Sequence, residues 1–90
     1  MLDKLIEEGK SFENQFVQGD WGDDLLINSS VESDYLKWLS RVGTYGEASL
    51  RGCIPDMTKD ILQVVKARSR DKINYNIIMG YLESAKELGF

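Results

Sequence analysis

Residues 73–88, INYNIIMGYLESAKEL, decide the fold that we expect for this chain. At about 100° per residue, their apolar side chains spread around most of a helical cylinder. The apolar members are Ile73, Ile77, Ile78, Met79, Tyr81, Leu82, Ala85 and Leu88. A helix that is apolar nearly all round is a buried one. We therefore expect a helix over about 72–88, capped by Asp71, at the centre of the domain.

Two further helices are predicted upstream by apolar spacings of three and four residues. The first runs over about 2–17, and its stripe consists of Leu2, Leu5, Ile6, Gly9, Phe12 and Phe16. Gly9 has no side chain, so it would let another helix approach closely. The second starts near Ser30, where Ser29 and Glu32 form a capping-box pattern. Its stripe contains Val31, Tyr35, Trp38, Leu39 and Val42, and we expect it to end at Gly43 or Gly46.

A third helix is predicted over about 57–69, with Asp56 as its cap. Its expected core stripe is Met57, Ile61, Val64 and Val65. Residues 43–55 between the second and third helices lack a strong period. A structureless loop of this length is uncommon, so this segment is either partly helical around residues 47–50 or functional. The predicted fold is a single all-α domain over 1–90, a small bundle of about four helices with a long loop between helices 2 and 3.

The composition argues for a folded chain without catalytic machinery. Of its 90 residues 42 % are hydrophobic, there is one cysteine, Cys53, and there is no histidine. These counts exclude a histidine-based triad and a Cys/His zinc site. The aspartates of the GDWGDD stretch, residues 19–24, fail the spacing of a calcium-binding loop, so we interpret them as turn residues. We expect no catalytic residue, no metal and no cofactor.

No apolar run approaches the about 20 residues that span a bilayer. The first ten residues, MLDKLIEEGK, lack the continuous apolar region of a signal peptide. We therefore expect no membrane partner and a cytosolic location.

A cluster of positive charge stands out in a chain of net charge −4. On the predicted third helix, Lys59, Lys66 and Arg70 lie opposite the apolar stripe, whereas Arg68 falls on the core side. Cations near a helix C-terminus are favoured by the helix dipole, so a solvated helix end explains most of the cluster. Contact with a protein partner is the second interpretation, and nucleic acid, for which no recognition motif is present, is the least favoured.

Three stretches carry a resemblance to a known class of protein. They are LDKLIEEGKSF at 2–12, YLKWLSRVGTYG at 35–46 and INYNIIMGYLESAKEL at 73–88. Together, with Gly9 and Trp38, they resemble a helical N-terminal module of bacterial multidomain proteins associated with phage defence. In that group the module precedes an effector domain that is nucleotide-binding or TIR-like. The resemblance implies an all-helical adaptor or oligomerisation module.

We therefore expect a non-catalytic helical module that binds protein, as part of a larger bacterial protein or as a free-standing relative. Its partner is a second copy in a homodimer, a following domain or another protein. The expected contact residues are Ile78, Met79 and Leu82, with Trp21, Lys59, Lys66 and Arg70. Two alternatives stay open: an acidic inhibitor that mimics a negatively charged ligand of a basic enzyme, and a weak nucleic-acid binder.

Overall fold

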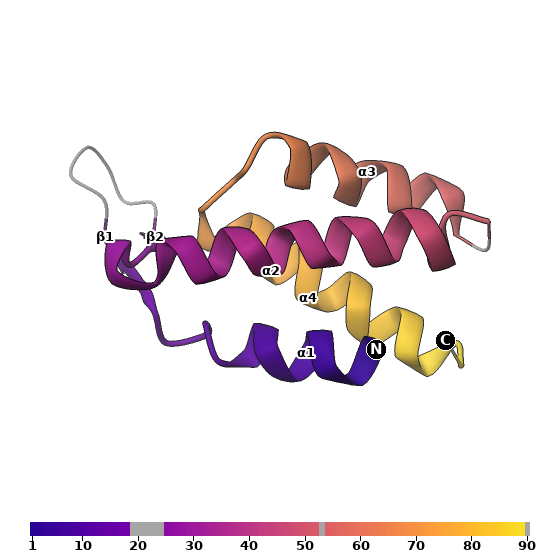
Figure 1. Ribbon diagram of the computed structural model, residues 1–90, viewed down its shortest axis with the longest axis horizontal. Coiled ribbons are helices and arrows are strands. Elements are labelled where there is room, and N and C mark those ends of the chain that lie inside the picture. The colour runs from indigo at the N-terminus through magenta and orange to yellow at the C-terminus, as the bar shows by residue number, and fades with distance from the viewer. Residues whose placement is uncertain (19–24, 53, 90) are drawn as a thin grey trace.

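The computed structural model describes residues 1–18, 25–52 and 54–89, which form four α-helices and one small hairpin (Figure 1). The helices are α1 (Leu2–Lys10), α2 (Glu32–Tyr45), α3 (Pro55–Lys66) and α4 (Lys72–Glu87). A 3₁₀ turn, η1 (Ser29–Val31), precedes α2, and a π-helical turn, η2 (Gly46–Leu50), continues it. The predicted four-helix architecture is confirmed, and the hairpin is an element that the sequence analysis missed.

The hairpin replaces the second half of the predicted first helix. α1 ends at Lys10, where the Ser11 hydroxyl donates a hydrogen bond to the Glu8 carbonyl at 2.6 Å. β1 (Phe16–Gln18) then pairs antiparallel with β2 (Leu25–Ile27), and Phe16 lies opposite Ile27. The prediction of a helix to residue 17 is therefore wrong.

The boundaries of α2 also differ from the prediction. Its N-cap is Val31, without a side-chain capping hydrogen bond, so the expected cap at Ser29 is not found. The Asn28 side chain caps the preceding turn η1 instead, accepting a hydrogen bond from the Ser30 amide at 3.0 Å. At the other end α2 continues into η2, which buries Leu50 completely. Much of the expected 43–55 loop is therefore helical, as the alternative around residues 47–50 proposed.

The N-terminus of α3 differs from the prediction, whereas the N-terminus of α4 has the predicted cap. Pro55 occupies the first turn of α3, and no side chain caps this helix. Of the predicted stripe, Ile61 is buried and Val64 and Val65 pack against the core, whereas Met57 is 42 % exposed and Thr58 is buried in its place. Asp71 caps α4 by accepting a 2.7 Å hydrogen bond from the Asn74 amide.

α4 is the central helix, as predicted. Its side chains supply a large share of the core, and the buried ones are Tyr75, Ile78, Met79, Tyr81, Leu82 and Ala85. In Figure 1, α4 passes behind α2 and continues toward the N-terminal end of α1. Inside the core, the Tyr81 and Thr58 hydroxyls lie 3.0 Å apart and hydrogen-bond to each other.

α1 packs very closely against α2 and α4 through Gly9. A β-carbon added at Gly9 would lie 2.5 Å from Met79 Sδ and 2.6 Å from Trp38 Cζ2. The buried indole of Trp38 donates a 2.9 Å hydrogen bond to the Leu5 carbonyl, and the Tyr75 hydroxyl donates to the Gly9 carbonyl at 2.6 Å. The expected role of Gly9 in close helix approach is confirmed.

Rings from four segments form an aromatic cluster in the core: Phe12, Phe16, Tyr35, Trp38 and Tyr75. Phe12 and Phe16 are four residues apart, as on a helix, but Phe12 lies in a turn and Phe16 in β1. Both place their rings in this cluster. Among the buried side-chain polar atoms in the described ranges, only the Tyr35 hydroxyl lacks a hydrogen-bond partner. A buried hydroxyl without a partner destabilises the folded state.

We expect Tyr35→Phe to raise the free energy of unfolding at neutral pH by about 1 kcal/mol, because it removes this unpaired hydroxyl. Burial raises the pKa of Tyr35 above its ordinary 10.0, and that of Tyr75 to about 12. Both phenols ionise more easily in the unfolded chain, so stability present below pH 10 is lost as the pH rises above it. Tyr35→Phe should therefore also weaken this alkaline loss, as urea unfolding at several pH values will measure. A lower stability of the variant at pH 7 would contradict the prediction.

Candidate interaction surfaces

The three apolar residues expected to contact a partner lie inside the chain's own core. Ile78 and Leu82 are 0 % exposed and Met79 is 8 % exposed. All three belong to the hydrophobic core, so they cannot form a partner surface in this fold, and the prediction is corrected. Trp21 lies outside the described residues.

The predicted cations are exposed but do not form one face. Lys59 and Lys66 are exposed on α3. Arg70 follows the end of that helix and pairs with Glu32 at 2.7 Å. Arg68 is exposed as well, which corrects its expected position on the core side: α3 ends at Lys66, so helical angles no longer apply at residue 68.

The apolar surface that α4 leaves uncovered is a different set of residues, here called the outer face of α4. Ile73, Ile77 and Leu88 are 67 %, 50 % and 65 % exposed, and their spacing places them on one side of the helix. Gly80 lies between them on the same side, and a β-carbon there would meet nothing within 4 Å. The central helix therefore does carry exposed apolar surface, on the side opposite to Ile78 and Leu82.

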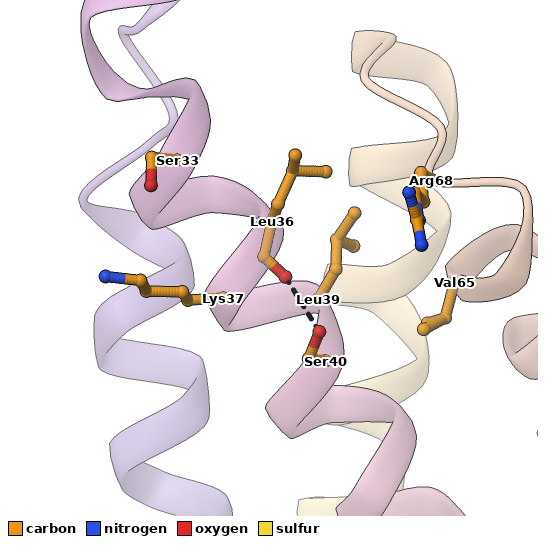
Figure 2. Close-up of a pocket in the computed structure, with 7 residues that line it drawn as sticks. All are labelled: Ser33, Leu36, Lys37, Leu39, Ser40, Val65 and Arg68. Carbon is orange, nitrogen blue, oxygen red and sulfur yellow. Dashed lines mark hydrogen bonds between the residues drawn. The ribbon is translucent and has the colours of Figure 1, made fainter.

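A second surface is the groove between α2 and α3, here called the α2–α3 groove. One stretch of it is a hollow of about 340 Å³, drawn in Figure 2. Its floor is apolar, with Leu39 buried and Leu36 and Val65 half-buried. The Ser40 hydroxyl on its edge donates a 3.1 Å hydrogen bond to the Leu36 carbonyl.

The groove continues along both helices beyond this hollow. A second, wider hollow of about 540 Å³ shares Ser40 and Val65 with the first. It reaches from Gly43 to Ala48 on the α2 side and includes Leu62 on α3. A β-carbon at Gly43 would lie 3.0 Å from Val65 Cγ1, so the missing side chain lets the two helices approach closely at the floor.

The charges along the α2–α3 groove have the opposite sign to the net charge of the chain. Its lining contains the three cations Lys37, Lys66 and Arg68. Within the parts of the chain that the structure describes, none of the three makes an ion pair. The one carboxylate of the lining, Glu47, is ion-paired with Arg51. The groove is therefore cationic although the chain carries −4.

Arg68 adopts an uncommon backbone conformation at the end of α3. Its φ is 52°, in the left-handed region that favours glycine. Its amide donates to the Val65 carbonyl at 3.0 Å, and the Ser69 amide donates to Val64 at 3.3 Å. This pair of hydrogen bonds is the Schellman motif, in which glycine is the usual residue at this position.

Sequence reasoning missed the groove, although a signal was present. Leu36 and Leu62 are apolar but lie off the predicted core stripes, and both line the groove. Apolar residues that lie beside a core stripe and close to cations are the pattern in the sequence that indicates such a groove.

No protein-family model, curated protein or solved structure matches this chain. Over the ranges that the structure describes, no helix is both long enough and apolar enough to cross a membrane.

Proposed function

We propose that the chain is a non-catalytic helical interaction module that self-associates through the outer face of α4. The observation that carries the proposal is the exposure of Ile73, Ile77 and Leu88 on one side of the central helix. Ile73 and Ile77 lie one helical turn apart, and neighbouring exposed apolar side chains of this kind are typical of an interface. The resemblance to helical modules of bacterial phage-defence proteins supports the same function, as part of a larger protein.

An antiparallel pair of α4 helices fits this face. At Gly80 a second helix can approach closely, because no side chain fills the space. The polar flank of the face carries Lys72 at its N-terminal end and Glu83 and Glu87 toward its C-terminal end. In an antiparallel pair, Lys72 of each copy would lie near Glu87 of the other. Opposite charges placed in this way favour the antiparallel orientation.

Ile77→Glu is expected to weaken self-association at least about tenfold, because it removes a buried contact worth about 1.5–3 kcal/mol and places a charge in an apolar interface. The measurement is the solution mass by light scattering from low to high micromolar concentration. Met57→Glu is the matched control: Met57 is also an exposed apolar helical residue, at 42 %, but it lies on α3 outside this face.

A chain that stays monomeric at every concentration would reject self-association. If the average solution mass decreased equally in the Met57→Glu and Ile77→Glu variants, the assignment to α4 would also be rejected. General charge repulsion would then explain the result.

A further inference from the structure

We propose that the α2–α3 groove binds an acidic, amphipathic helical segment of another protein. This surface is separate from the outer face of α4, so the proposal does not depend on self-association. Three features of the groove support this proposal: its apolar floor, the cations that border it, and the backbone conformation of Arg68.

The floor suits a row of apolar side chains. Leu36, Leu62 and Val65 are half-buried, so each keeps apolar surface that a docked side chain could cover. The lining runs from Ser33 to Ala48 on the α2 side, which is about 20 Å at 1.5 Å per residue. A helical segment of about four turns has this length and presents apolar residues at every third or fourth position.

The cations suit acidic residues on both flanks of such a segment. Figure 2 shows Arg68 on the α3 side of the floor, whereas Lys37 extends from the opposite side of α2. The two charges therefore border the floor and do not converge on one point, which fits an extended partner better than a small anion. Lys66 adds a third cation along the groove. Complementary charge of this kind favours an acidic partner and rapid association.

The residue type at position 68 is unfavourable for the stability of the fold. Glycine adopts the left-handed conformation without the steric cost that a β-carbon imposes. Arginine occupies that position here, at φ 52°, and its side chain lies exposed at the border of the groove without an ion pair among the described residues. Strained conformations of this kind are concentrated at binding and catalytic sites. We attribute the arginine to partner binding.

The test uses the full 90-residue chain and three synthetic peptides of about four helical turns. All three share one leucine stripe, and their flanking residues are glutamate, glutamine or lysine. We expect the glutamate peptide to bind most tightly, with amide NMR shifts concentrated at Leu36, Leu62 and Val65. Its affinity should fall as salt is raised, because the flanking charges are exposed.

Arg68→Gly separates binding from folding, because the two effects have opposite signs. The variant is expected to lose about tenfold in affinity for the glutamate peptide, from the loss of one charged contact. Its melting temperature should rise by about 4–8 °C, because the strain at this position is relieved. Lys59→Ala is the control: it removes an exposed cation of α3 that does not line the groove, so it should leave affinity unchanged.

Equal binding of the glutamate and glutamine peptides would overturn the proposal, as would unchanged affinity in Arg68→Gly. Peptide shifts located on Ile73 and Ile77 would also reject it. A single-stranded oligonucleotide that displaces the glutamate peptide would assign the groove to nucleic acid instead. Repeating the titration with Ile77→Glu makes the result independent of self-association through α4.

Discussion

Trp38→Ala is expected to lower the free energy of unfolding by about 3–5 kcal/mol. Trp38 is the largest fully buried side chain among the residues that the structure describes, at 0 % exposed, and its ring contacts Phe12, Tyr35 and Tyr75. Removing it leaves a large cavity between α1, α2 and α4. A domain of this size has about 5–15 kcal/mol of stability in total. The variant should therefore lose a large fraction of its stability and unfold at a lower temperature and a lower urea concentration. Urea unfolding followed by circular dichroism measures the loss.

Trp38→Phe separates the two contributions of the side chain. The phenyl ring keeps most of the aromatic packing but cannot donate to the Leu5 carbonyl. We expect a loss of about 1 kcal/mol from the hydrogen bond and a smaller cavity contribution than in the alanine variant. If Trp38→Ala unfolded at the same urea concentration as the unchanged chain, the placement of Trp38 in the core would be wrong.

Two Gly→Ala substitutions are expected to change the free energy of unfolding in opposite directions. Gly9→Ala is expected to destabilise the chain by about 1–3 kcal/mol, because its methyl group overlaps Met79 and Trp38. The thioether can move, but the indole is held by its bond to Leu5. Gly80→Ala lies in α4 with open space around it. It should stabilise the chain by about 0.5–1 kcal/mol through helix propensity.

Thermal unfolding of both variants at low protein concentration, where pairing through α4 contributes little, measures this difference. A stabilising effect of Gly9→Ala similar to that of Gly80→Ala would show that α1 does not approach Trp38 closely.

The helices that could be predicted are those whose apolar residues all belong to one continuous helical period. α4 was found with its cap because Asp71 and the run from Ile73 to Leu88 give a consistent signal. The hairpin was missed because the spacing of Phe12 and Phe16 imitates a helix. Nothing in local spacing reveals that a turn intervenes and that both rings reach Tyr35 from different backbone conformations.

The apolar residues of α4 that were expected to contact a partner lie on the buried side of the helix. Periodicity gives the angles between side chains around the helix, so it shows that α4 is apolar nearly all round. The direction of the core depends on where α1, α2 and α3 pack, which one helix cannot reveal. The structure buries Ile78 and Leu82 and exposes Ile73 and Ile77. The α2–α3 groove is formed by two helices together, so the pattern of one helix does not predict it. The position of Arg68 depends on the residue at which α3 ends.

The packing of α1 on α4 also sets the order of events during synthesis. The Tyr75 hydroxyl bonds to the Gly9 carbonyl 66 residues away, and Lys86 pairs with Asp3 at 2.8 Å. α1 has nine residues, too few to be stable alone in water. A ribosome adds about 5–20 residues per second, so α1 must wait several seconds for α4. During that interval the apolar stripe of α1 has no α4 to pack against, and this core cannot be completed before α4 is made.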